Sequence, residues 1–308
     1  MATHRLDPHV FYTTHGQHPP ALRVQPGDTV ILHTLDARGR DRESAPRGER
    51  PNPQSGPIWV EGAEPGDALE VTIVRLTPSR PTGWTLYPLA PNVVDPERAQ
   101  QFPERATAEW LIDLAAGTVR LADPPPALAS MVLPLDPMIG CFGVAPAGGE
   151  AIATSTPGPH GGNMDWRGFR PGAAVWFPVA VAGALFSAGD GHARQGDGEI
   201  CGTGVEVSME MELRLDLRKG WPIHWPRGVT ADGAELFTVG SARPLDQALQ
   251  HATTEMLDWL EWDYSLDAVA ASHLLGQTVG YDVGNIFNPA YTVVCRVRRE
   301  LVETRVTG

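Results

Sequence analysis

The longest strict alternation of apolar and polar residues in the chain runs through residues 205–217. Apolar side chains occupy the odd positions from Val205 to Leu217, and charged or hydroxyl side chains occupy the positions between them, beginning with Glu206. Successive side chains of a β-strand point to opposite faces, so the segment predicts one strand with a buried face and a solvated face. Such a strand is typical of an antiparallel sandwich or barrel, because strands of a parallel sheet are covered on both sides.

Other strands are predicted from turn signals. Pro-Gly pairs that begin at Pro26, Pro65 and Pro171 each precede an alternating segment. Proline followed by glycine favours a type II turn, because proline presets its own φ and glycine accepts a positive one. A further strand is expected in YTVVCRVRRE, near the C-terminus. The chain should therefore be dominated by strands.

Helical periodicity appears late in the chain. Apolar residues recur three and four apart from Leu245 to Trp259, directly after Pro244. This spacing predicts a helix, and a second, shorter helix is expected from Ser265 to Gly276. We therefore predict a β-rich α+β chain with an antiparallel β-sandwich or barrel core and a C-terminal helical hairpin. It should form a single unit, β-rich over residues 1–240, with the helical hairpin and the final strand in 241–308.

The charge balance restricts the partners of the chain. Its formal net charge is −13, with no basic block, which argues against a nucleic-acid surface. The first residues lack the apolar core of a signal peptide, and the longest apolar run, VWFPVAVAGALF, is too short to cross a bilayer. We expect a cytoplasmic protein without a membrane partner. Lys219 is the only lysine, so mechanisms that need a catalytic lysine have one candidate.

Two glycine-rich segments collect residues suited to chemistry. GDGHARQGDGEICG, residues 189–202, contains His192 among acidic turns, and PGPHGGNMDWRGF, residues 157–169, contains His160 and Asp165. Each could be a surface loop with Asp-Gly turns and no function. Together, bridged by a predicted strand, they could instead converge on one centre. Imidazoles with carboxylates suit zinc, iron or manganese, whereas carboxylates and carbonyls alone suit calcium.

Several blocks of the sequence resemble the acetamidase/formamidase family. They are GPIWVEGAEPGD at 56–67, IGCFGVAP at 139–146, PGPHGGNMD at 157–165 and PVAVAGALFSAGDGHARQGDGEICGTGVE at 178–206, in the order of the family. The resemblance implies hydrolysis of a short aliphatic amide, such as formamide or acetamide, to the carboxylate and ammonia. It also implies a β-rich fold with a smaller α/β portion, a divalent metal, a small neutral amide as the substrate, and a homodimer or homotetramer.

The resemblance, with the chemistry of the side chains, assigns roles within these blocks. The expected metal ligands are His160, His192, Asp36 and Asp165, with zinc as the metal and calcium as the alternative. Glu199 is the first choice for the carboxylate that moves the proton of a metal-activated water to the leaving nitrogen, and Asp197 is the second. The expected substrate-binding residues are Asn163, Asp190 and the glycines Gly161 and Gly162, whose N–H groups could hold the oxyanion.

Two other functions agree with the same residues. A non-catalytic β-sandwich module could use the acidic glycine-rich loops to bind calcium or a carbohydrate. A non-haem iron oxygenase could use two histidines and one carboxylate. Amide turnover and metal selectivity separate the hydrolase from the binding module, because a hydrolase needs a desolvated pocket beside the metal.

Overall fold

The computed structural model describes residues 1–303. Its largest sheet has nine strands, and neighbouring strands are antiparallel except for the edge pair at the N-terminus. In spatial order these strands are β1 (Thr3–Leu6), β4 (Asp28–His33), β16 (Met209–Arg218), β6 (Ala68–Pro78), β14 (Ala174–Pro178), β17 (Arg227–Val229), β18 (Glu235–Ala242), β20 (Tyr291–Arg298) and β19 (Gly280–Asn285).

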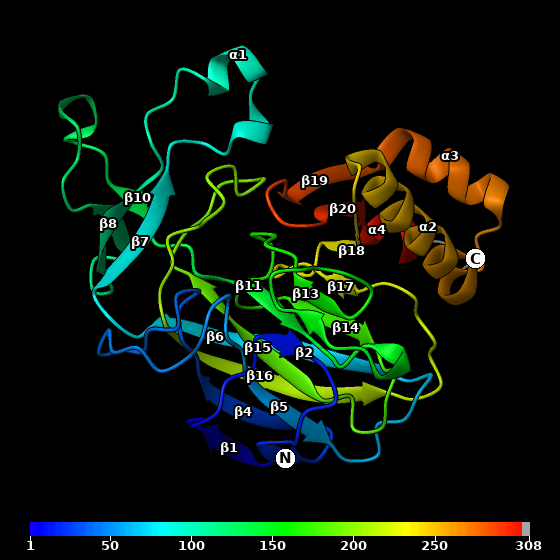
Figure 1. The fold of residues 1–308 in the computed structure, drawn as a ribbon. Coiled ribbons are helices and arrows are strands. Elements are labelled where there is room, and N and C mark those ends of the chain that lie inside the picture. Colours follow the sequence, from blue (N-terminus) through cyan, green and yellow to red (C-terminus); the bar gives the residue numbers. More distant parts are fainter. Residues whose placement is uncertain (304–308) are drawn as a thin grey trace.

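A five-stranded sheet packs on one face of this large sheet (Figure 1). Aromatic rings of the two sheets pack against each other at the interface. The ring centroids of Phe142 and Phe186 in the smaller sheet lie 5.1 and 6.3 Å from that of Phe177 in β14. These rings belong to one continuous buried apolar cluster, so the two sheets form a sandwich. The strands of the smaller sheet are β13 (Gly161–Asn163), β11 (Met138–Gly143), β15 (Phe186–His192), β5 (Ser55–Val60) and β3 (Leu22–Val24).

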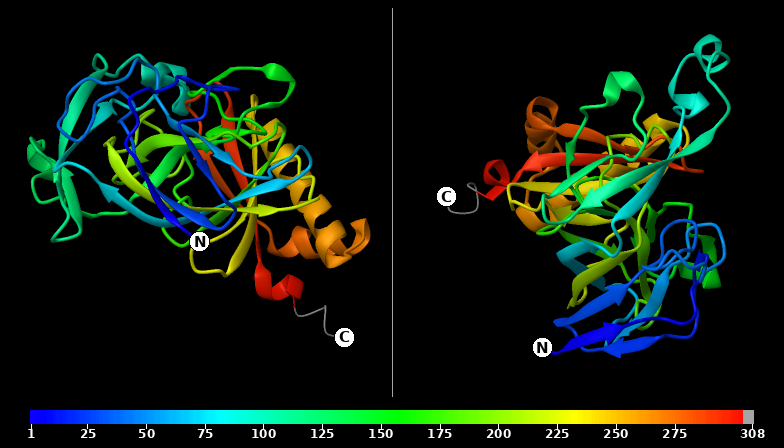
Figure 2. Two further views of the ribbon diagram at one scale, coloured as in Figure 1. Left: turned by 90° about the horizontal axis from the view of Figure 1, so that it is seen from below. Right: turned by 90° about the vertical axis from the view of Figure 1, so that its left-hand side faces the viewer.

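Two smaller sheets and several short helical turns complete the β-rich part. A four-stranded sheet extends away from the sandwich together with α1, as Figures 1 and 2 show. We call residues 82–134 the arm. Its strands are β7 (Thr82–Tyr87), β8 (Ala106–Asp113), β9 (Thr118–Leu121) and β10 (Leu133–Pro134), and its helices are η1 (Pro91–Val93), α1 (Pro96–Ala99) and η2 (Pro126–Leu128). Elsewhere lie η3 (Ala147–Gly149) and the pair β2 (Thr14–His15) and β12 (Ile152–Ala153).

The C-terminal helices cover one end of the large sheet. Helix α2 (Leu245–Tyr264) packs on β18 and β20, helix α3 (Ala268–Thr278) contacts α2, and the short α4 (Arg299–Glu303) follows β20. A second buried cluster, which includes Met256, Trp259 and Val297, lies under these helices. No helix within residues 1–303 is long and apolar enough to cross a membrane.

The predicted fold class is confirmed, with corrections to its details. Among the described residues no sheet closes into a barrel, so the core is a sandwich. The long alternating strand begins at Met209 and not at Val205, because the preceding residues turn away to pair with β7 and β15 through Glu206. The second helix begins at Ala268, since Ser265 adopts the left-handed conformation that ends α2 and the side chain of Asp267 caps α3. The single-unit organisation stays a prediction.

One buried ion pair joins α2 to the large sheet. Arg227 of β17 donates from Nε to Oε1 of Glu255 at 2.6 Å, and the two side chains are 0% and 1% exposed. The guanidinium lies over Trp221 and Trp259, at 5.0 and 5.4 Å from the ring centroids. The aromatic rings replace part of the hydration that burial removes from the cation.

We expect Glu255→Gln to destabilise the protein by about 3–5 kcal/mol, because it leaves a buried arginine charge without its partner. The free energy of unfolding from urea titration measures the effect. Glu261→Gln, which alters an exposed position of the same helix, is the control and should change it by less than about 0.5 kcal/mol. Equal stability of the two variants would show that the ion pair does not hold α2.

Candidate active site

The site begins at the end of strand β15, where it pairs with β11. Asp190 adopts a left-handed backbone conformation with φ 57°, and His192 ends the strand. The partner strand contributes Gly140, and a Cβ at that position would lie 2.4 Å from Oδ1 of Asp165 and 2.6 Å from Oδ2 of Asp190. Glycine is required at this place because two carboxylates approach the backbone there. The missing side chain creates the space for the site.

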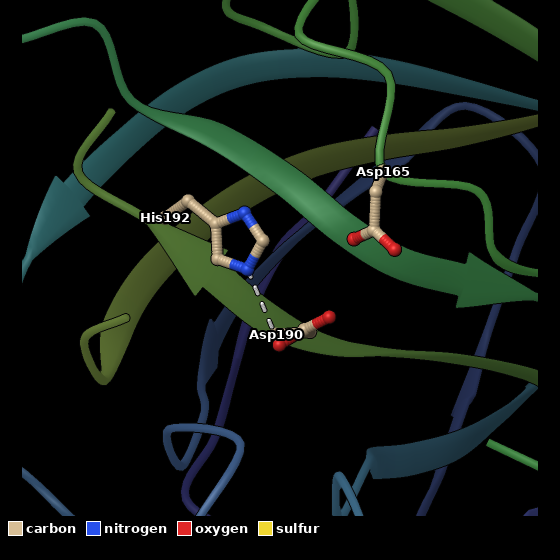
Figure 3. Close-up of side chains that lie close together, drawn as sticks. All are labelled: Asp165, Asp190 and His192. Atoms are coloured by element: carbon tan, nitrogen blue, oxygen red, sulfur yellow. Dashed lines mark ion pairs between the residues drawn. The ribbon is translucent and has the colours of Figure 1, made fainter. Parts of the chain in front are cut away.

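Five ionisable side chains meet in this space: Asp190 and His192 of β15, with Asp165, Glu199 and Glu206 from other segments. We call them the acidic cluster. None is more than 5% exposed. Nε2 of His192 lies 3.4 Å from Oδ1 of Asp190 and 3.0 Å from Oε1 of Glu206. Figure 3 shows the His192 ring directed toward Asp190, with Asp165 facing them from a neighbouring segment.

The cluster contains two groups of potential ligands with one member in common. Asp165, Asp190 and His192 offer ligand atoms within 4.8 Å of one another, and so do His192, Glu199 and Glu206. Because His192 belongs to both groups, they are adjacent. The two loops that the sequence indicated, residues 157–169 and 189–202, therefore do converge.

Gln195 orients the imidazole at this centre. Its Nε2 donates to the carbonyls of Asp165 and Gly284, at 2.5 and 3.4 Å, so its Oε1 faces Nδ1 of His192 at 2.8 Å. This network assigns both the amide orientation and the tautomer. Nδ1 of His192 is the donor, and Nε2 directs its lone pair toward the carboxylates when the ring is neutral.

The electrostatics of the cluster are dominated by burial and by repulsion among the acids. Burial raises the pKa of Asp165 well above its usual value, and the charges of Glu199 and Asp190 raise it further. Burial, with the neighbouring acids, also raises the pKa of both Glu199 and Glu206 to about 8. Burial lowers the pKa of His192, but the attraction of the charged imidazolium to Glu206 and Asp190 is larger, so this pKa lies well above its usual value. The cluster therefore retains protons near neutral pH unless a cation replaces them.

The donor atoms of the cluster fit a divalent cation. Oδ1 of Asp165 and Oε2 of Glu206 are buried without a hydrogen-bond partner, and Nε2 of His192 is paired only with the acids Asp190 and Glu206. Unpaired buried polar atoms are rare in folded proteins because each loses its hydration without compensation. One imidazole nitrogen with several carboxylate oxygens is a donor set that zinc, manganese or iron accepts.

Two of the expected carboxylates, Asp36 and Asp197, lie outside the acidic cluster. Both carboxylate oxygens of Asp36 are already bonded: Oδ2 accepts from Arg80 and Trp84, and Oδ1 accepts from the amides of Arg38 and Arg40. Its oxygens are thus committed to holding the loop that follows β4. Asp197 lies at the surface, where its side chain is 52% exposed and pairs with Arg167. The structure does not bring either carboxylate to the centre.

The residues around His160 form a separate buried group. His160 lies beside His15, with ring centroids 5.3 Å apart, and burial lowers its pKa to about 4. The N–H of Gly161 donates to the carbonyl of Gly158, so it is engaged in a turn. Gly162 follows in β13, which pairs with β11. Oδ1 of Asn163 accepts from Asn52 at 2.7 Å. None of these residues belongs to the ligand groups found among the described residues.

Two members of the site were not recognised from the sequence. Glu206 was expected on the solvated face of a strand, but it is 2% exposed and faces His192. The alternation suggested the wrong side because the regular strand starts only at Met209. A usable signal was present, since Glu206 ends the glycine-rich block at 178–206. Gln195 lies within the acidic loop, but an amide in such a loop has no distinctive pattern.

The fold and the cluster define a β-sandwich protein with a buried carboxylate and imidazole centre. The model of the Acetamidase/Formamidase family matches residues 3–149 and 146–229. The chain belongs to this family.

Individual relatives agree with this assignment. The chain is 32% identical to an acetamidase of Mycolicibacterium smegmatis over 244 residues, which cover 62% of this chain and 58% of the relative. It is 27% identical to a formamidase of Methylophilus methylotrophus over 257 residues, which cover 67% and 63%. The structure of an acetamidase from Yersinia enterocolitica has 33% sequence identity and a TM-score of 0.82, covering 95% of this chain and 89% of that one. The matches span about three fifths of the length of the two curated relatives.

We expect Gly140→Ala to disrupt the acidic cluster, because the added Cβ would overlap the carboxylates of Asp165 and Asp190. Zn²⁺ affinity, measured by competition with a chromophoric chelator, should fall at least about tenfold, and the free energy of unfolding should fall by about 1–3 kcal/mol. Gly196→Ala is the control, since a Cβ at that position in the acidic loop meets no atom within 4 Å. Unchanged Zn²⁺ affinity in Gly140→Ala would contradict the packing described above.

Proposed function

We propose that this protein hydrolyses a short aliphatic amide to a carboxylate and ammonia at the acidic cluster, with a bound divalent cation. Membership of the acetamidase/formamidase family supports the reaction class. The observation that carries the proposal is the group of buried carboxylates around Nε2 of His192, which includes two oxygens without a hydrogen-bond partner. A binding module could leave its cation at the surface, whereas hydrolysis gains from a site that excludes bulk water.

The cation would be held by His192, Asp165 and Asp190, with Glu206 beside them. When bound, a divalent cation polarises the amide carbonyl and lowers the pKa of a water molecule to roughly 7. Gln195 keeps Nδ1 of His192 protonated, so the lone pair of Nε2 remains directed at the centre. Zinc remains our first choice, because imidazole and carboxylate ligands both suit it.

Glu199 is the proposed proton carrier. Burial raises its pKa to about 8 in the metal-free cluster, and a bound cation would lower it, so the ionised carboxylate could accept a proton near neutral pH. In the reaction, the oxygen of water bonds to the carbonyl carbon, and Glu199 accepts the proton that this water releases. Glu199 then donates that proton to the amide nitrogen as the carbon–nitrogen bond breaks. Ammonia and the carboxylic acid leave, and the acid ionises in solution.

We expect protein purified without chelator to release ammonia from at least one member of a series comprising formamide, acetamide, propionamide and butyramide. Removal of the metal with a chelator should abolish the release, and added Zn²⁺ or Mn²⁺ should restore it, because the buried carboxylates around His192 then regain a cation. Folded, metal-replete protein that releases no ammonia from any of the four amides would contradict the proposal. If such protein still bound Ca²⁺ tightly, the binding-module hypothesis would take its place.

We expect Glu199→Gln to lower kcat for ammonia release by about 10²–10⁴-fold, because glutamine cannot carry a proton. Zn²⁺ affinity and the thermal midpoint should change little. Asp197→Asn is the matched control: it alters a carboxylate two positions away that is half exposed and pairs with Arg167, and it should retain activity. Activity retained by Glu199→Gln but lost in Glu206→Gln would assign proton transfer to Glu206 instead.

A further inference from the structure

The hairpin formed by β19 and β20 reaches the acidic cluster from a distant part of the sequence. Gly198 donates to the carbonyl of Val283 at 2.8 Å and accepts from the amide of Ile286 at 2.9 Å, so the acidic loop lies directly against this hairpin. In Figure 1 the turn between β19 and β20 lies beside the yellow-green loop that follows β15. The hairpin also lies beyond the residues that the family model matches, 3–149 and 146–229.

Asn288, in the turn between β19 and β20, contacts the cluster through its side chain. Its Nδ2 donates to Oδ2 of Asp165 at 2.6 Å and to the carbonyl of Asn163 at 2.9 Å. Both hydrogens of this amide group therefore have acceptors. Asn288 is buried, with 6% of its surface exposed. The contact spans 123 residues of sequence. Asn288 therefore constrains the rotation of the Asp165 carboxylate.

A second asparagine holds Asn288 in place. Oδ1 of Asn285 accepts from the backbone amide of Asn288 at 3.2 Å. Its Nδ2 donates to the carbonyl of Asn163 at 3.1 Å and to Oγ1 of Thr292 at 3.0 Å. Asn285 and Thr292 are both 0% exposed. The turn is thus attached to the segment that carries Asp165 and to strand β20 at the same time.

The two oxygens of Asp165 consequently differ. Oδ2 is engaged by Asn288, whereas Oδ1 is buried without a partner, and Asp165 belongs to the ligand group with Asp190 and His192. A carboxylate with one oxygen held by an amide presents the other in a defined direction, and such supporting contacts tune the affinity of a metal site.

We propose that Asn288 is a positioning residue that fixes the carboxylate of Asp165 through Oδ2, leaves Oδ1 free for a ligand, and so sets the affinity of the cluster for a divalent cation. The inference rests on the proposed function in one respect, since it requires that the acidic cluster binds a cation. It assigns a role at the site to a segment close to the C-terminus, which neither the glycine-rich blocks nor the family match includes.

The test is Zn²⁺ binding to the full chain by competition with a chromophoric chelator. We expect Asn288→Ala to weaken Zn²⁺ binding by about 10–100-fold. The absorption bands of the Co²⁺-loaded protein should also shift, because the coordination by Asp165 changes. A merely structural role would lower the thermal midpoint of the metal-free protein and leave both of these readouts as in wild type.

The control is Asn92→Ala. Asn92 is an asparagine of the arm whose Nδ2 donates to the carbonyl of Ile286 in the same turn, at 2.6 Å, without contacting Asp165. This variant should bind Zn²⁺ as wild type does. If Asn92→Ala weakens binding as much as Asn288→Ala, the effect comes from general loosening of the turn and the proposal is wrong.

A second substitution at the same position tests the proposal in case Asn288→Ala fails to fold. Asn288→Leu has a similar shape but cannot donate a hydrogen bond to Asp165, so it should also weaken Zn²⁺ binding by about tenfold or more. Wild-type affinity in either folded variant would overturn the proposal while leaving the proposed function intact. Wild-type protein that binds neither Zn²⁺ nor Co²⁺ would overturn both, and the two failures are therefore distinguishable.

Discussion

The structure depends on the burial of four carboxylates around one imidazole. Ionised carboxylates lose several kcal/mol of hydration when they leave water, and at close range they repel one another. The chain cannot compensate for this with lysine, because its single lysine, Lys219, pairs with Asp67 away from the cluster. Only protons or a bound cation can balance the charge. This requirement links the fold to the chemistry, because a group that must exchange protons or hold a metal is the kind of group that catalysis uses.

The β-sandwich makes that burial possible. Strands β11 and β15 bring their backbones together without intervening side chains at Gly140, and the large sheet covers the other side through residues such as Met209. The cluster therefore lies in a rigid scaffold whose apolar core is continuous across both sheets. Amide side chains then orient the ligands: Gln195 acts on His192 and Asn288 acts on Asp165. Neutral amides suit this role because they donate and accept without adding charge.

The structure brings some of the residues that the sequence indicated into one cluster and places others elsewhere, for identifiable physical reasons. His192 and Asp165 were singled out because an imidazole and carboxylates lie among glycines in two loops that a strand could join, and the structure brings both into one ligand group. Asp36 was expected there too, but hydrogen bonds to its two oxygens, which no local pattern reveals, commit it to its own loop. Glu206 was assigned to the solvent by its alternation, although the pairing of its backbone with His192 directs it inward. Asn288 carried no local signal at all.

The sequence alone determined the strand-dominated class, the helical hairpin and the two loops that supply the site, because period-two alternation, helical spacing and glycine clusters act over short range. Tertiary structure alone decided which acids meet. Contacts such as Asn288 with Asp165, which lie 123 residues apart, follow from how the strands are ordered across the sheets. The same holds for the protonation of the cluster, since a pKa depends on burial and on neighbours in space, whatever their distance along the chain.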